Sequence, residues 1–221
     1  MASFPFDVVV FDLDGTLVDS SADLAAALNH VLARLGRPTA DAATVRRLVG
    51  RGARVLIREG LALTGASSER LVDENYPVFI DYYAAHIRDG TRPYPGVEAM
   101  LDELGERGAR PAICTNKPER LTHLLIDALG WRGRFEAIVG ADTLPVRKPD
   151  PAVLHHACAL LGVERALMIG DSANDALAAR AAGIPVLLVT YGYTEGVPVD
   201  TIECDGLLST ASEALSRIQR A

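Results

Sequence analysis

Short apolar runs recur along the chain, and each ends in glycine or in polar residues. Four stand out, at residues 8–11, 109–114, 166–169 and 185–189, with a weaker one at 136–139. Runs of this length that are apolar on both faces are typical of central strands in a parallel sheet. We therefore expect buried parallel strands at these positions.

Helical patterns separate the apolar runs. Leucine and valine fall at i, i+4, i+7, i+8 and i+11 from residue 24 to residue 35, and similar stripes run through 97–104 and 121–129. Glycines follow several of these stripes and mark their ends. From about residue 95, helices and strands alternate, which predicts an α/β fold with a Rossmann-like, doubly wound parallel sheet.

Residues 18–92 depart from this alternation. After the first strand they contain only helical patterns, which we place at residues 20–35, 41–49, 52–64 and 68–87. This is too much helix for one crossover between neighbouring strands. We expect residues 1–17 and 93–221 to form a Rossmann-like catalytic core. Residues 18–92 would form a helical cap over the carboxyl edge of its sheet.

Composition narrows the classes of partner. The chain has 221 residues, 49% of them hydrophobic and 23% charged, and a formal net charge of −7. An acidic chain without a basic run is a poor candidate for binding nucleic acid or an anionic membrane, and no apolar run is long enough to span a bilayer. No secretory signal pattern is seen, and the three cysteines are far apart. We therefore expect free thiols in a cytoplasmic protein, as a monomer or homodimer.

Candidate chemistry lies where the predicted strands end, because ligands of open parallel sheets bind beyond the carboxyl ends of the strands. The residues that follow these ends are Asp12, Asp14, Gly15, Thr115, Asn116, Lys148, Asp171 and Asp175. In an extended segment Asp12 and Asp14 would share a face and would repel unless a cation lay between them. Asp171 and Asp175 would be neighbours on the first turn of a helix. This number of carboxylates suits Mg²⁺, together with water and a substrate phosphate.

These residue types predict hydrolysis of a small phosphate ester. A carboxylate can attack phosphorus and divide the reaction into two steps through an aspartyl-phosphate, a role we expect for Asp12. Asp14 is placed to protonate the leaving oxygen and then to deprotonate water. Lys148 and Thr115 would face the phosphate, and Gly15 would let the backbone approach it.

The chain resembles the haloacid dehalogenase superfamily of phosphohydrolases. Residues 12–20 (DLDGTLVDS) resemble its first motif, and Thr115-Asn116, Lys148-Pro149 and residues 170–175 resemble its second, third and fourth motifs, in order. The family also has a helical cap inserted after the first motif.

The resemblance implies a role for each matched residue. Asp12 would be the nucleophile and a Mg²⁺ ligand, and Asp14 the acid/base, with its backbone carbonyl on the metal. Asp171 would be a second carboxylate ligand, and Asp175 an outer-shell or occasional one. Thr115, Asn116 and Lys148 would bind phosphate. An acid/base carboxylate at the position of Asp14 is typical of the family's phosphatases and is absent from its dehalogenases.

Residues 46–53, 170–183 and 190–193 resemble family members that hydrolyse 2-phosphoglycolate to glycolate and phosphate. Only the first of these stretches lies in the cap and bears on the substrate. Within it, Arg51 stands in a Gly-Arg-Gly turn, where it could meet a substrate carboxylate or point to solvent.

Other interpretations stay open at this point. The substrate could be a sugar phosphate or another small metabolite, and the four motifs do not separate hydrolysis from phosphomutase chemistry. A receiver domain, which forms an aspartyl-phosphate without being an enzyme, and a binding module without catalysis are alternatives from other classes. Locally, Asp175 could serve only its helix dipole, and Thr115 and Asn116 could cap a helix.

Overall fold

The computed structural model describes residues 6–218 and contains a six-stranded sheet in the order β5-β4-β1-β6-β7-β8, with every pair parallel. The strands are β1 (Val8–Phe11), β4 (Arg110–Cys114), β5 (Ala137–Val139), β6 (Ala166–Gly170), β7 (Val186–Val189) and β8 (Gly206–Leu208). The α/β prediction and its five strands are confirmed. β8 was not predicted, because three residues at a sheet edge are too few to show a pattern. Residues 1–5 and 219–221 of the expected core lie outside the described residues.

The order of the strands creates a crevice at the end of β1. From β1 the chain proceeds to β4 and β5 on one side, and then to β6, β7 and β8 on the other. Ligands of open parallel sheets bind at such a reversal, beyond the carboxyl ends of the strands. The residues that follow β1, β4 and β6 are therefore the ones that this topology brings together.

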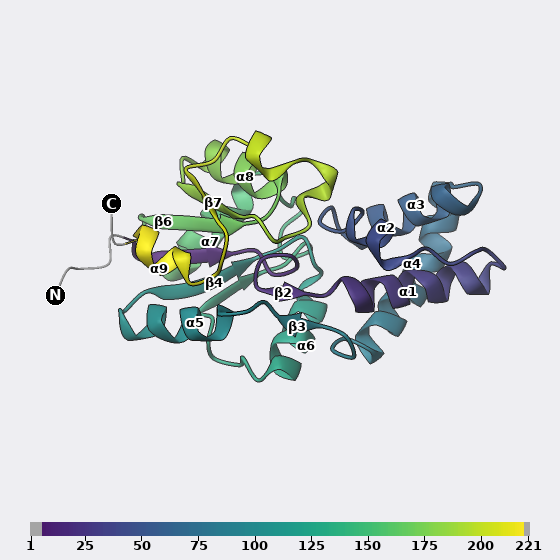
Figure 1. Ribbon diagram of the computed structural model, residues 1–221, viewed down its shortest axis with the longest axis horizontal. Helices are drawn as coiled ribbons and strands as arrows, with labels where there is room; N and C mark the ends of the chain where they lie inside the picture. Colours follow the sequence, from purple (N-terminus) through teal and green to yellow (C-terminus); the bar gives the residue numbers. More distant parts are fainter. Residues whose placement is uncertain (1–5, 219–221) are drawn as a thin grey trace.

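Helices cover both faces of the sheet (Figure 1). Val9 and Phe11 of β1 pack in one apolar cluster with α5 (Val97–Glu106), α6 (Glu119–Leu129) and α9 (Glu213–Ile218). Val8 and Val10 pack in another with α7 (Ala152–Leu161) and α8 (Ala173–Ala182). Alternate residues of a strand point to opposite faces, so the continuous apolar run follows from burial of both. Short 3₁₀ turns at Thr194–Gly196 and Val199–Thr201 follow β7.

A helical insert stands at one end of the molecule, beyond the carboxyl edge of the sheet (Figure 1). It consists of α1 (Ser21–Arg34), α2 (Ala42–Arg46), α3 (Ala53–Thr64) and α4 (Glu69–Ala85). The chain enters and leaves it through β2 (Val18–Asp19) and β3 (Arg92–Pro93), which pair antiparallel. Leu28, Ile57 and Phe79 belong to its own apolar cluster.

The second helix of the insert is shorter than the predicted 41–49. Asp41 caps its start by accepting a hydrogen bond from the Thr44 N–H, and the helix ends at Arg46. Gly50 and Gly52 then have φ of +121° and +90°, values that favour glycine and that turn the chain towards α3.

Two sets of polar contacts hold the insert in place, one buried within it and one partly buried that reaches the core. Asp23 of α1 accepts hydrogen bonds from the backbone N–H groups of Gly90 and Thr91, at 2.7 and 2.8 Å, and so ties the two connecting segments together. Arg46 of α2 donates to the Asp19 carboxylate at 2.6 Å and to the carbonyl of Tyr191 at 2.9 Å. Among the described residues, no helix is both long and apolar enough to cross a membrane.

Candidate active site

Five buried polar residues gather at the crevice beside β1. Asp12 follows β1, Thr115 follows β4 and Asp171 follows β6, while Lys148 comes from the loop before α7 and Asp175 from α8. The strand ends bring Asp12, Thr115 and Asp171 together as predicted, and none of the five residues is more than 7% exposed. Polar groups buried to this degree need partners or ligands.

Asp12, Asp171 and Asp175 form an acidic cluster. Each offers one carboxylate oxygen, and these atoms all lie within 4.8 Å of one another. Burial raises the pKa of Asp12 to about 7, although the ammonium of Lys148 acts in the opposite direction. Burial and the charges of Asp175 and Asp12 raise the pKa of Asp171 well above its ordinary value. Hard oxygen ligands placed this close fit a divalent cation such as Mg²⁺.

Lys148 is the cation that this cluster already contains. Its Nζ lies 3.0 Å from Asp12 Oδ1 and 2.6 Å from Asp175 Oδ1. Burial alone would lower the pKa of Lys148, but the charges of the two carboxylates outweigh burial and raise it. One ammonium cannot neutralise three carboxylates, so the cluster favours further positive charge.

Asp175 both starts a helix and pairs with Lys148. Its Oδ2 accepts the backbone N–H groups of Asp171 and Ser172, each at 3.1 Å, and Ser172 is the N-cap of α8. The prediction that Asp171 and Asp175 share the first helical turn is therefore wrong, since Asp171 precedes the cap. The Asp171 carboxylate does not cap the helix and accepts a hydrogen bond from the Tyr193 N–H at 2.7 Å.

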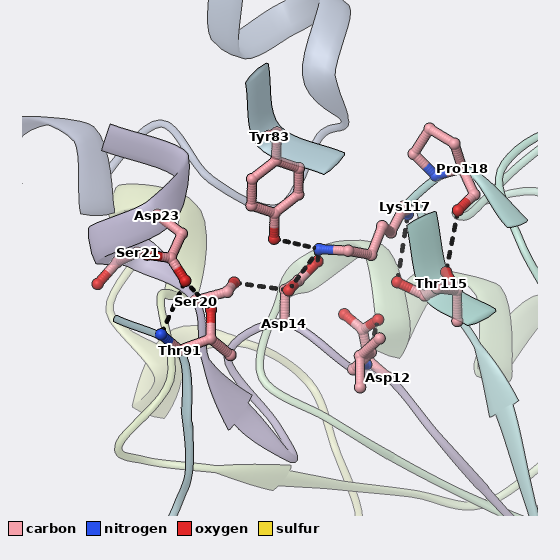
Figure 2. Close-up of polar contacts among 12 residues, drawn as sticks. Asp12, Asp14, Ser20, Ser21, Asp23, Tyr83, Thr91, Thr115, Lys117 and Pro118 are labelled. Atoms are coloured by element: carbon pink, nitrogen blue, oxygen red, sulfur yellow. Dashed lines mark hydrogen bonds and ion pairs between the residues drawn. The ribbon is translucent and has the colours of Figure 1, made fainter. Parts of the chain in front are cut away.

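Asp14 is held by partners of its own (Figure 2). Its carboxylate accepts hydrogen bonds from Lys117 Nζ, at 3.0 and 2.9 Å, and from Ser20 Oγ at 2.6 Å. Asp12 and Asp14 thus pair with different lysines, and the repulsion expected between them is relieved without a shared cation. The Asp14 side chain lies outside the acidic cluster, which leaves only its backbone carbonyl for the metal role that the resemblance implies.

Lys117 and Tyr83 were not among the predicted site residues. Lys117 Nζ also donates to Tyr83 Oη, at 2.6 Å, and both side chains are buried. The chain contains two lysines, Lys117 and Lys148, and both lie here, while every other basic residue besides histidine is arginine. Lys117 stands next to Thr115 and Asn116 in the sequence, so its position could have indicated a role. Tyr83 lies on α4 without any motif.

Thr115 and Asn116 do not cap α6, whose N-cap is Pro118. Thr115 Oγ1 accepts the Lys117 N–H at 3.2 Å (Figure 2). Asn116 Nδ2 donates to the carbonyls of Gly50 and Lys148, and its buried Oδ1 has no partner among the described residues. Both residues line the cavity described below, which is where a phosphate contact would occur.

Gly15 is required by its surroundings. Its φ is +89°, and a Cβ atom there would lie 2.2 Å from Asp171 Oδ2. No other residue fits between the first strand's end and the acidic cluster.

A cavity separates the sheet edge from the helical insert. Its empty volume is about 490 Å³, part of it open to solvent, and Asp12, Asp14 and Lys117 line one side of it. Gly50 and Gly52 of the turn line the other side, but Arg51 does not. The Arg51 side chain is 47% exposed and lies 3.9 Å from Glu59. In this structure, therefore, Arg51 does not reach over the site.

A Rossmann-like sheet with a carboxylate–lysine centre at its switch point and a helical insert beyond it defines a class of capped α/β hydrolases. Comparison with known proteins supports this class. The family model of the haloacid dehalogenase-like hydrolases matches residues 6–183. The chain belongs to this family, as the sequence motifs predict.

Individual relatives confirm the expected similarity to phosphoglycolate phosphatases. The chain is 47% identical to a phosphoglycolate phosphatase of Caulobacter vibrioides over 89% of this chain and 84% of that protein. It is 39% identical to one of Thiobacillus denitrificans over the full length of both. The crystal structure of a predicted phosphoglycolate phosphatase from Haemophilus somnus superposes with a TM-score of 0.91, at 31% identity, covering 96% of this chain and 98% of that one.

Proposed function

We propose that this hydrolase is a Mg²⁺-dependent, cytoplasmic phosphomonoester hydrolase that converts 2-phosphoglycolate to glycolate and phosphate. The observation that carries the proposal is the position of Asp12. It lies at the end of β1 in the crevice of the sheet, 3.0 Å from the ammonium of Lys148 and beside two further carboxylates. The names of the relatives supply the substrate. The free thiols of Cys114, Cys158 and Cys204 support the cytoplasmic location.

In the first step, a carboxylate oxygen of Asp12 attacks phosphorus and the bond from phosphorus to the glycolate oxygen breaks. Asp14 gives its proton to that leaving oxygen. In the second step, Asp14 takes a proton from water, whose oxygen attacks phosphorus and releases Asp12. Lys148, Thr115 and Asn116 hold the phosphoryl oxygens and offset their charge.

Asp12, Asp171 and the backbone carbonyl of Asp14 would hold Mg²⁺, with Asp175 behind them. The ion would supply positive charge at the phosphoryl oxygens. The acidic cluster supports this assignment, because three buried carboxylates lie together and one ammonium pairs with two of them.

Residues 18–92 would act as the cap domain of this enzyme, and residues 1–17 with 93–221 as its catalytic core. Contacts across the cavity support the division. Tyr83 and Gly50 of the insert meet Lys117 and Asn116 of the core. Such a cap excludes water when it is closed and restricts the site to small substrates.

Phosphate release from a panel of esters tests the function. The panel contains 2-phosphoglycolate, ethyl phosphate and glucose 6-phosphate, each with Mg²⁺ or with a chelator. We expect Mg²⁺-dependent release with the highest kcat/KM for 2-phosphoglycolate. A preference for the sugar phosphate would replace the substrate but keep the mechanism, whereas transfer of the phosphoryl group within the sugar would indicate a mutase. No release from any ester would refute the proposal.

Stabilisation by Mg²⁺ should depend on pH. Burial raises the pKa of Asp12 from 3.8 to about 7, so the stability that its protonated form contributes is lost as the pH rises through 7. Mg²⁺ binds ionised carboxylates and should restore that stability. At roughly a hundredfold excess over its Kd, we expect Mg²⁺ to raise Tm by about 5–10 °C near pH 8 and by much less near pH 5.

Thermal unfolding followed by circular dichroism checks this, with KCl at equal ionic strength as the control. An equal shift at both pH values would mean that Mg²⁺ does not bind the buried carboxylates.

A further inference from the structure

Tyr83 and Lys117 meet inside the cavity, one from the helical insert and one from the sheet edge (Figure 2). Tyr83 of α4 is 1% exposed and Lys117 is 5% exposed. Lys117 Nζ donates to Tyr83 Oη at 2.6 Å and also holds Asp14. Through this contact, the insert meets the polar residues that line the sheet side of the cavity.

Counting donors leaves the hydroxyl proton of Tyr83 without an acceptor among the residues that the structure describes. An ammonium has only donors, so Tyr83 Oη must accept from Lys117 and can still donate its own proton. Burial raises the pKa of Tyr83 to about 12, which keeps that proton in place. Within residues 6–218, the bond from Lys117 is the one hydrogen bond of Tyr83 Oη. A buried donor normally has an acceptor, so this hydroxyl suits a ligand oxygen.

The charge of the cavity indicates what kind of oxygen that is. Its walls beyond the catalytic carboxylates are mainly apolar, with Leu24, Leu56 and Phe79 among them. Of the described residues that line it, Lys117 is the one cation. An anionic group enters apolar surroundings only with positive charge and a hydrogen-bond donor beside it. Tyr83 supplies the donor, and the ammonium of Lys117, which also pairs with Asp14, supplies the charge.

We propose that Tyr83 Oη, with Lys117 behind it, binds the carboxylate of a short phosphorylated acid and selects such substrates over uncharged phosphate esters. The phosphoryl group lies at Asp12 on the same cavity, and the carboxylate occupies the end that meets α4. The inference rests on the proposed function and assigns specificity to Tyr83 in place of Arg51. Because Tyr83 belongs to the insert and Lys117 to the core, the bound carboxylate also joins the two.

The substitution Tyr83→Phe removes the hydroxyl and keeps the ring. We expect the ratio of kcat/KM for 2-phosphoglycolate to that for ethyl phosphate to fall about tenfold or more, mainly through KM, since a hydrogen bond to a charged group is lost. Tyr82→Phe is the matched control, because Tyr82 is the next residue of α4, stacks on His30 and does not line the cavity. An equal loss for both esters would assign Tyr83 a structural role only and overturn the inference.

The two lysines allow a test that does not depend on turnover. Protein with the substitution Asp12→Asn and isotope-labelled lysine should give two side-chain NMR signals, with that of Lys117 identified by its loss in Lys117→Arg. We expect 2-phosphoglycolate to shift the Lys117 signal and ethyl phosphate to leave it in place. An unshifted Lys117 signal overturns the inference even where the wild-type protein hydrolyses 2-phosphoglycolate. A shifted signal together with absence of turnover in the wild-type protein would refute the proposed function and support the binding site.

Discussion

Replacing Asp12 with asparagine should abolish phosphate release from every ester, a loss on the order of 10³-fold or more. The amide is a poor nucleophile, so it cannot form the acyl phosphate on which both steps depend. The substitution keeps the size of the side chain beside Lys148, which retains Asp175 at 2.6 Å as a partner. Initial rates with saturating 2-phosphoglycolate and Mg²⁺ measure the loss.

The fold should survive this substitution. The raised pKa of Asp12 means that ionising this carboxylate costs folding free energy. Without Mg²⁺ near pH 8, the Asp12→Asn protein should therefore be at least as resistant to urea as the wild type.

Asp142→Asn is the matched control for activity, because Asp142 also follows a strand of the sheet but is exposed and accepts a hydrogen bond from the Glu119 N–H. We expect its rate to stay within twofold of the wild type. More than a tenth of the wild-type rate in Asp12→Asn would exclude Asp12 as the nucleophile.

The sequence predicts the part of the site that depends on strand ends. Apolar runs locate β1, β4 and β6, and parallel strands bring the residues after them to one edge of the sheet. The positions of Asp12, Thr115 and Asp171 in the chain are therefore enough to place them together. A local signal in the sequence also marks where α8 begins. Ser172 and Asp175 have the spacing of a capping box, which places the start of α8 after Asp171.

The contacts between the insert and the core could not be predicted in this way. Tyr83 reaches Lys117 because the face of α4 that carries it is turned towards the sheet edge. The hydrophobic pattern of a helix shows which of its residues are buried, but not which other part of the protein they contact. Arg51 is a second case in which the sequence does not show where a side chain of the insert points. The Gly-Arg-Gly turn does line the cavity through Gly50 and Gly52, but the arginine between them lies near Glu59, outside the cavity.

Replacing Lys148 with methionine should both inactivate the enzyme and destabilise the fold, by about 3–5 kcal/mol near pH 8. Lys148 is 3% exposed and is the ammonium between Asp12 and Asp175. Without it, no cation of residues 6–218 pairs with the acidic cluster, and its carboxylates must either repel one another or take up protons. Since burial already raises the pKa of Asp12 and Asp171, stability in the variant should fall more steeply as the pH rises.

Urea unfolding at several pH values, with and without Mg²⁺, measures this effect. Mg²⁺ should recover part of the lost stability, because it brings positive charge back to the same carboxylates, but it should not recover activity, since the phosphoryl group still lacks the ammonium. Arg147→Met is the control, because Arg147 is the neighbouring cation in the sequence but is exposed, and its loss should cost under about 0.5 kcal/mol. If Lys148→Met were as stable as this control at every pH, the acidic cluster would not depend on Lys148 for its charge balance, and a bound cation would have to be its main partner.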